Sequence, residues 1–368
     1  MSNLNPPRRL LFGPGPSQVA PRVYEAMTKS IVGHLDPFFF EVYEDVRTGL
    51  RAVFGTQNSF VQVISGTGSA GMEASVANFV GPGQKLAVFV GGFFAGRIAE
   101  MGERHGATVV RFDMPLGEAA TETQATEFLN RERPDVVAFV HAETSTGVLQ
   151  DPLAITRPAH AIGALTISDC VTSIGALPIN VNAAGIDVAF GCTQKGLSCP
   201  PGLSPITLSD AAVEHLRART KPSSVWYMDL KLLLEYYEGA HRYHHTAPIT
   251  SFYALREGLA LVCEEGVQNR FDRHVRMHQE FVRRIEAAGF RMFVTDPARR
   301  ITTINAIHVP DGVDPVKSRK ALVDKYGIDI GGGYASLANK IFRVGLMGPL
   351  ATMENVDMLV DAMVECIQ

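Results

Sequence analysis

Residues 60–190 repeat one unit: a buried apolar strand, a turn of small residues and a helix. Strands are predicted at 60–64, 85–90, 108–112, 136–140, 164–169 and 188–190, with helices at 72–80, 97–106, 123–131 and 154–162. Strands joined in this way form a parallel sheet, and ligands bind such a sheet beyond the carboxyl ends of its strands. We therefore predict an α/β fold with a large, doubly wound, mostly parallel sheet.

One lysine follows a strand in an unusual setting. Lys195 lies after the strand 188–190 among small and apolar residues, and no acidic residue occurs between Val188 and Ile206. Burying a charged amine there is unfavourable, so its pKa would fall and the amine would become nucleophilic. A Schiff-base lysine needs this property, although an ordinary loop lysine fits the same pattern.

Asp169 ends the strand 164–169, 26 residues before Lys195. Because both residues follow parallel strands, we expect them on one rim of the sheet. A carboxylate there can keep a pyridine nitrogen protonated, and a lysine can form an imine with an aldehyde. Together they describe a pyridoxal phosphate (PLP) site. Taken alone, Asp169 also fits a helix cap or a turn residue.

A third feature is the turn Ser-Gly-Thr-Gly-Ser-Ala-Gly at 65–71, between a strand and a helix. Glycines let the backbone approach an anion, and a helix N-terminus favours negative charge. The turn is not a Walker loop, because no Gly-Lys-Ser/Thr follows it. It indicates a phosphate-binding turn of another kind.

Several ordered motifs carry a resemblance to a known family. They are Gly-Pro-Gly-Pro-Ser at 13–17, Ser-Asp-Cys-Val-Thr-Ser-Ile-Gly at 168–175, Thr-Gln-Lys-Gly-Leu-Ser-Cys-Pro-Pro-Gly at 193–202 and Lys-Ile-Phe-Arg-Val-Gly at 340–345. They resemble the alanine–glyoxylate and serine–pyruvate aminotransferases, which are class V, fold-type I PLP enzymes. The resemblance runs from residue 11 almost to the C-terminus. It implies PLP, alanine or serine as donor, a 2-oxo acid such as glyoxylate as acceptor, and a homodimer.

The resemblance also implies roles for single residues. Lys195 would carry the cofactor and transfer the proton, and Asp169 would hold the pyridinium. Arg343 would bind the substrate carboxylate through two parallel hydrogen bonds, beside the backbone of Gly15. The other cofactor contacts would be Gly66, Thr67, Gly68, Ser69, Phe94, Thr144 and Gln194, with Tyr243 and Thr246 reaching the cofactor of the partner subunit. No second carboxylate-binding residue is evident in these motifs, which favours small substrates.

The chain is predicted to contain an N-terminal arm (1–9), a large PLP-binding domain (10–262) and a smaller C-terminal α+β domain (263–368). In the last part, alternating apolar residues predict strands at 291–294, 303–309 and 341–345. Helical spacing predicts helices at 274–288, 316–325 and 354–366.

Composition disfavours several other classes of protein. A net charge of −4 gives no reason to expect a nucleic-acid or membrane partner, and no apolar run is long enough for a transmembrane helix. The adjacent His244 and His245 would point apart on a regular element, which argues against a metal site. Five cysteines without framework spacing, and a start without a signal-peptide segment, predict a cytoplasmic protein.

Close alternatives remain within the same fold. Gly-His-Leu-Asp-Pro at 33–37, including His34, resembles the ureidoglycine–glyoxylate aminotransferases, but Tyr243 stands where an asparagine is expected in that group. The intact turn at 66–69 argues against a pyridoxamine–pyruvate aminotransferase. A cysteine desulfurase needs a thiol on a mobile loop, and a PLP-binding regulator would ordinarily carry a DNA-binding extension. Cys170 departs from the small residue that the family usually has after its aspartate.

Overall fold

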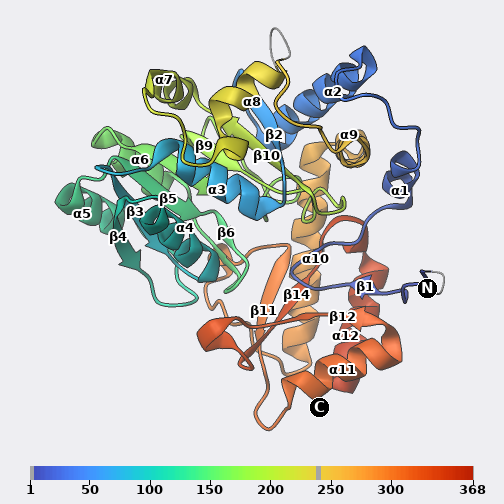
Figure 1. Cartoon of the computed structure of the whole chain (residues 1–368). Helices are drawn as coiled ribbons and strands as arrows, with labels where there is room; N and C mark the ends of the chain where they lie inside the picture. The colour runs from blue at the N-terminus through green and yellow to red at the C-terminus, as the bar shows by residue number, and fades with distance from the viewer. Residues whose placement is uncertain (1–3, 238–241, 368) are drawn as a thin grey trace.

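The computed structural model describes residues 4–237 and 242–367. Within them, seven strands form one sheet in which β10 runs antiparallel to the other six (Figure 1). In spatial order the strands are β2 (Phe60–Ser65), β10 (Leu203–Leu208), β9 (Val188–Phe190), β8 (Leu165–Asp169), β5 (Val136–Val140), β3 (Lys85–Val90) and β4 (Thr108–Asp113). The predicted α/β class with a large, mostly parallel sheet is confirmed.

Helices connect and cover these strands. They are α1 (Pro21–Met27), α2 (Pro37–Phe54), α3 (Gly68–Phe79), α4 (Phe93–Arg104), α5 (Glu122–Glu132), α6 (Leu153–Ala161), α7 (Asp210–Ala218), α8 (Leu230–Tyr237) and α9 (Ile249–Glu265). The strand β5 is buried along its whole length, as expected for a parallel strand covered on both faces. A short hairpin of β6 (Ala142–Glu143) and β7 (Val148–Leu149) follows it.

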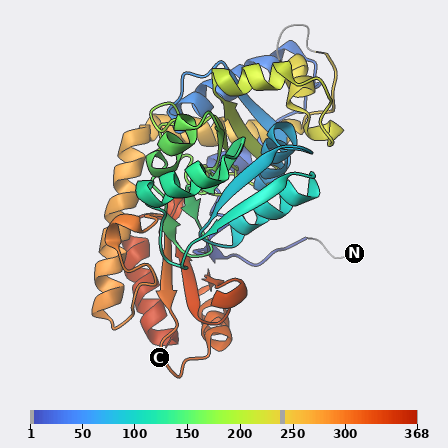
Figure 2. The same ribbon diagram turned by 90° about the vertical axis from the view of Figure 1, so that its left-hand side faces the viewer.

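The C-terminal elements form a second, smaller unit, drawn in orange and red (Figures 1 and 2). Its sheet has the order β11-β14-β13, with antiparallel pairs. The elements are α10 (Val267–Ala287), β11 (Ile304–His308), α11 (Pro315–Tyr326), β12 (Ile328–Asp329), β13 (Gly331–Gly332), β14 (Ile341–Gly345) and α12 (Met353–Cys366). They enclose a hydrophobic cluster separate from the cluster around the large sheet.

The segment after the N-terminal arm packs with this C-terminal unit. The strand β1 (Leu10–Leu11) pairs in parallel with β12, and Phe12 is buried in the C-terminal cluster. The sequence-based division places both in the large domain, so the spatial arrangement differs from it at this segment. The boundary at residue 262 remains a prediction.

Several element bounds differ from the sequence-based expectation. The helices α3 and α4 each begin four residues earlier than predicted, at Gly68 and Phe93. The predicted strand at 291–294 is reduced to one bridge, Met292 with Ile307. The helix α10 begins at Val267 rather than at 274. The early starts of α3 and α4 matter most, because they place the glycine-rich turn and Phe94 in first turns of helices.

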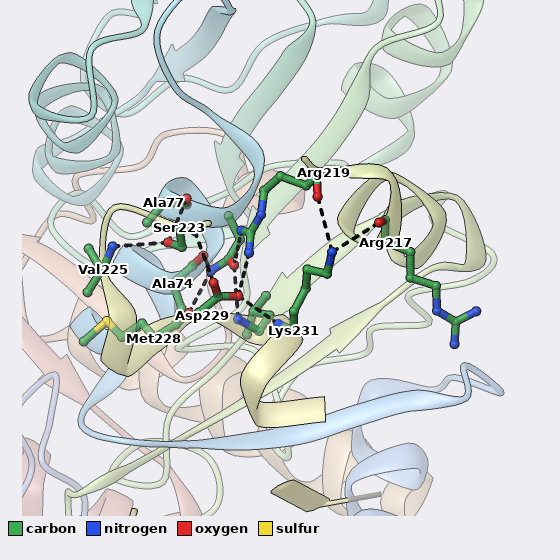
Figure 3. Close-up of polar contacts among 11 residues, drawn as sticks. Ala74, Ala77, Arg217, Arg219, Ser223, Val225, Met228, Asp229 and Lys231 are labelled. Carbon is green, nitrogen blue, oxygen red and sulfur yellow. Dashed lines mark hydrogen bonds and ion pairs between the residues drawn. The ribbon is translucent and has the colours of Figure 1, made fainter. Parts of the chain in front are cut away.

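A polar cluster fixes the segment between α7 and α8 to α3 (Figure 3). Asp229 accepts a hydrogen bond from Arg219 at 2.6 Å and another from the amide of Ser223 at 3.1 Å. Asn78, in the last turn of α3, accepts from Arg219 at 2.7 Å and donates to the carbonyl of Met228 at 2.8 Å. These contacts anchor the segment between α7 and α8 to α3, the helix that begins at the glycine-rich turn.

Across the described ranges, 4–237 and 242–367, we find no helix with the length and apolar character that crossing a membrane requires.

Candidate active site

Lys195 lies in the turn between β9 and β10. Its carbonyl accepts a hydrogen bond from the Ser17 hydroxyl at 2.7 Å, and the Ser17 amide donates to Gln194 O at 2.9 Å. The Nζ of Lys195 donates to the carbonyl of Pro14. Burial lowers the pKa of the Lys195 ammonium, and the positive charge of Arg343 lowers it further. The N-terminal segment thus holds the lysine where the neutral, nucleophilic amine is favoured.

Asp169 is the last residue of β8, the strand beside β9. Its side chain is buried, with 4% of the residue exposed, and its Oδ1 accepts a hydrogen bond from the Val171 amide at 2.8 Å. Burial raises the pKa of the Asp169 carboxyl to about 7, and the Glu143 carboxylate adds to this effect. The Val171 hydrogen bond and the Lys195 charge oppose it. Without a positive partner, this carboxylate is poorly stabilised.

Both residues line one cavity of about 190 Å³. The glycine-rich turn contributes residues 67–69 to its wall, and Phe94, Thr144 and Gln194 also line it. The structure therefore places side chains from distant motifs around a single space. Gly66 lies directly before this wall and donates its amide to Gly202 O at 2.9 Å.

The glycine-rich turn leads directly into α3. Its N-cap, Thr67, makes no side-chain capping hydrogen bond, so the first amides of this helix are available to an anion. A Cβ at Gly68 would lie 2.9 Å from the Val171 side chain, and one at Gly66 would lie 2.5 Å from the Ala70 Cβ. Close packing therefore requires glycine at both positions.

Gln194 supplies a further sign that the cavity takes a polar ligand. Its Oε1 is buried and has no hydrogen-bond partner among the residues that the structure describes. A buried acceptor without a partner is unfavourable, and Gln194 lines the same cavity as Lys195. A ligand with a polar group could satisfy it. The residues present thus fit a group that carries a phosphate and a protonated ring nitrogen.

Phe94 enters the cavity from the first turn of α4, which is capped from another loop. The Glu143 carboxylate accepts from the Ala95 amide at 3.2 Å and from the Ser145 hydroxyl at 2.5 Å, and the Ser145 Oγ accepts from the Phe93 amide at 2.9 Å. The N-cap residue of α4 is a glycine and has no side chain for this task. Burial raises the pKa of Glu143. Glu143 therefore has a structural role that acts on the position of Phe94.

Arg343 lies on β14 and faces a second cavity of about 350 Å³. Its Nη1 donates to Thr144 O at 3.2 Å, so it is in contact with a residue that lines the first cavity. Gly15 lines the second cavity and lies against Lys195, because a Cβ there would lie 2.5 Å from the lysine Nζ. The two cavities therefore adjoin at Lys195 and Arg343.

Two residues of the second cavity were not identified from the sequence. Arg319 and Tyr334 line it together with Arg343. Arg319 lies against Gly332, where an added Cβ would be 3.4 Å from its guanidinium carbon. The sequence motifs contain no second basic residue that could bind a carboxylate. Outside these motifs, however, α11 brings Arg319 into the wall of the same cavity as Arg343. Its position on an unremarkable helical segment gave no signal for this.

Tyr243 and Thr246 do not line either cavity within one chain. Tyr243 is 59% exposed, and Thr246 is also exposed. Tyr243 contacts His34, with ring centres 5.3 Å apart. The neighbouring histidines do not point apart as expected: His244 Nδ1 and His245 Nδ1 are 2.9 Å apart. This segment has no regular secondary structure, so the alternation of side chains along a strand does not apply.

Comparisons with known proteins agree with this geometry. The family model described as aminotransferase class-V matches residues 9–359. The alanine–glyoxylate aminotransferase of Callithrix jacchus is 38% identical and covers 99% of this chain and 89% of its own length. A crystal structure of an alanine–glyoxylate aminotransferase from Nostoc sp. has a TM-score of 0.98 at 40% identity and covers 100% of this chain and 97% of its own.

A second solved relative bears the name of a different aminotransferase. The ureidoglycine–glyoxylate aminotransferase from Bacillus subtilis has a TM-score of 0.97 at 34% identity and covers 99% of this chain and 94% of its own. The family model and these relatives extend over nearly the whole chain. The chain therefore belongs to the class-V aminotransferase family.

Proposed function

We propose that this aminotransferase uses PLP to move an amino group from alanine or serine to a 2-oxo acid, with glyoxylate as the acceptor. The observation that carries the proposal is the meeting of Lys195 and Asp169 with the glycine-rich turn at 67–69 around one cavity. PLP, when bound, supplies an electron sink for the carbanion that forms at the substrate Cα. The residues of this chain would bind it, orient it and move the proton.

In this proposal Lys195 has two tasks. Its amine, whose pKa burial lowers, would hold the cofactor through the cofactor aldehyde. The same Nζ would move the proton at the substrate Cα as a general base. Asp169 accepts a hydrogen bond from the protonated ring nitrogen, and this positive partner would lower its raised pKa.

The remaining cavity residues hold the cofactor in the proposal. The amides of Thr67, Gly68 and Ser69, at the start of α3, bind the phosphate. Gly66, whose own amide is bonded to Gly202 O, forms the tight turn that presents them. Phe94 would pack on the ring, and the Thr144 hydroxyl would donate to the phenolate oxygen. Gln194 would hydrogen-bond the cofactor through its unpaired Oε1 or its side-chain amide.

Arg343 would bind the substrate α-carboxylate, beside Gly15. The residue is 3% exposed and opens on the second cavity, where a guanidinium can hold a carboxylate through two hydrogen bonds. Every donor and acceptor in the proposal carries this carboxylate. A dicarboxylic donor such as aspartate is a second candidate, favoured by Arg319 in the same wall.

We also propose a homodimer in which Tyr243 and Thr246 reach the cofactor of the partner subunit. Their exposure away from the cavity of their own chain supports this arrangement. A cytoplasmic location is likewise proposed, supported by five free cysteines.

Two related aminotransferase activities differ from the proposed one in their amino donor. Ureidoglycine is a candidate donor because of the relative from Bacillus subtilis, and pyridoxamine is one because of the family resemblance. Desulfuration of cysteine is disfavoured, since Cys263 and Cys366 lie on α9 and α12 rather than on a loop beside the cavities. Single-turnover reactions with alanine, serine, aspartate, ureidoglycine and pyridoxamine, followed by the PLP absorption band, would rank these donors.

The proposal as a whole is tested at Lys195. The purified protein should be yellow, and borohydride should fix the cofactor covalently to the peptide that contains Lys195. Lys195→Ala should retain PLP only reversibly and form no such link. Fixation to another lysine in the parent protein would overturn the assignment of the site.

A further inference from the structure

Beside Arg343 lies an aromatic side chain that belongs to none of the sequence motifs. The guanidinium carbon of Arg343 is 4.2 Å from the centre of the Tyr334 ring, which is within the range of a cation–π contact. The Nε of Arg343 donates to Gly332 O at 2.7 Å, and Nη1 donates to Thr144 O at 3.2 Å. The guanidinium is therefore held by an aromatic ring together with two backbone carbonyls.

Tyr334 is held in turn by the first turn of α4. Its ring stacks on Phe93 with centres 5.1 Å apart and planes at 30°, and it meets Phe94 edge-on at 6.2 Å. Phe93 and Phe94 belong to the large-sheet part of the chain, whereas Tyr334 precedes the short turn 335–337 of the C-terminal part. Tyr334 thus connects the arginine of the second cavity with the helix that carries Phe94.

The fold fixes the backbone that carries Tyr334. The Leu337 amide donates to Tyr334 O at 2.9 Å, and Gly333 N donates to Ile341 O at 3.0 Å. Leu337 is buried against Ala306 and Ile341. At Gly333, a Cβ would lie 2.0 Å from Leu337 O, so the tight turn requires glycine. The ring therefore stands on an ordered turn at the cavity, where 43% of the residue remains exposed.

We propose that Tyr334 is a positioning residue, which holds the Arg343 guanidinium in the orientation that receives the substrate carboxylate. The inference rests on the proposed role of Arg343 in carboxylate binding. A guanidinium attached through several rotatable bonds loses side-chain entropy when it is ordered by a ligand. With the ring and both carbonyls already in contact with it, much of that ordering is complete before the substrate arrives.

The test uses propionate, which has a carboxylate but no amino group, as a competitor with the holoenzyme. In Tyr334→Leu, the dissociation constant of propionate and the KM values of alanine and glyoxylate should rise about 3- to 30-fold, the range of one cation–π contact. The kcat should change much less, because the ring touches neither Lys195 nor Asp169. Tyr334→Phe keeps the aromatic face and removes only the hydroxyl, which also interacts with the Arg343 guanidinium, so it should weaken binding clearly less than Tyr334→Leu.

Two further measurements separate the possible failures. PLP affinity of each variant should remain near that of the parent, since Tyr334 does not line the cofactor cavity. If Tyr334→Leu weakens the binding of PLP as much as that of propionate, or if Tyr334→Phe binds propionate as weakly as Tyr334→Leu, the positioning role of the ring is wrong. If Arg343→Ala weakens propionate and Tyr334→Leu does not, only this inference fails. If Arg343→Ala leaves propionate binding intact, the proposed function of Arg343 fails first.

Discussion

Asp169 should make the cofactor-free protein less stable as the pH rises, and Asp169→Asn should remove that effect. Burial raises the pKa of this carboxyl to about 7, from an ordinary value of 3.8 that applies in the unfolded chain. The asparagine oxygen can still accept the hydrogen bond from the Val171 amide, 2.8 Å away in the parent. The substitution therefore removes the ionisation and little else.

The sign follows from proton binding. Between about pH 4 and pH 7 the folded protein keeps a proton on Asp169 that the unfolded chain has released, so raising the pH favours unfolding. The stabilisation is complete below the unfolded pKa and is lost as the pH rises through the folded pKa. The interval from 3.8 to about 7 corresponds to at most about 4 kcal/mol. About 2 kcal/mol of this is lost between pH 5 and pH 7, because this pH interval lies between the unfolded and the folded pKa values.

Urea unfolding of the cofactor-free protein, followed by circular dichroism from pH 5 to pH 8, measures this effect. Buried histidines such as His141 and His274, whose pKa values burial lowers to about 4 and about 3, act in the opposite direction. The informative quantity is therefore the difference between parent and Asp169→Asn at each pH. Asp311→Asn, the same substitution at an exposed position, serves as a control for the loss of one surface carboxylate. A difference for Asp169→Asn that does not vary with pH, or that varies in the opposite direction, would refute the reasoning.

Two further predictions concern the proposed dimer and the cap of α4. Mixing inactive Lys195→Ala subunits with inactive Tyr243→Ala/Thr246→Ala subunits should restore one working site per heterodimer; heterodimers without activity would contradict the shared site. Glu143→Gln should cost about 1–3 kcal/mol of unfolding free energy, because an amide cannot accept all the hydrogen bonds of the carboxylate, and it should alter the visible circular dichroism of bound PLP through Phe94. Thermal unfolding measures the loss of stability. A loss of stability with an unchanged dichroism band would contradict the link to Phe94.

The sheet could be predicted from the sequence because its strands are nearly continuous apolar runs. The strand β5 is an example: all five of its residues are buried, and such a run is typical of a parallel strand covered on both faces. Lys195 and Asp169 were placed on one rim by topology alone, and β8 and β9 are indeed parallel neighbours. Parallel pairing follows from the repeated strand–helix–strand pattern, whereas the strand order and the antiparallel strand β10 were not predicted.

The features that could not be predicted depend on contacts between distant segments. The first turn of α4 is capped by Glu143 and Ser145, about 50 positions along the chain, whereas a local cap is the signal that marks a helix start. Tyr334 and Arg319 reach the second cavity only through the packing of the C-terminal unit. The apolar alternation at 291–294 predicted a strand, but the pairing is limited to the bridge between Met292 and Ile307 and the two backbone hydrogen bonds that flank it.

The segment 12–17 shows how the two halves of the site are kept in register. Phe12 O accepts a hydrogen bond from Gly345 N at 2.7 Å, next to the end of the strand that carries Arg343. Five residues later, the Ser17 hydroxyl donates to Lys195 O at 2.7 Å. Between these two attachments Gly15 has a φ of +127°, and a Cβ there would lie 2.5 Å from the Lys195 Nζ. The separation between the proposed carboxylate anchor and the nucleophile is therefore set by a short segment, stiffened by two prolines, in which Gly15 cannot acquire a side chain without displacing the lysine.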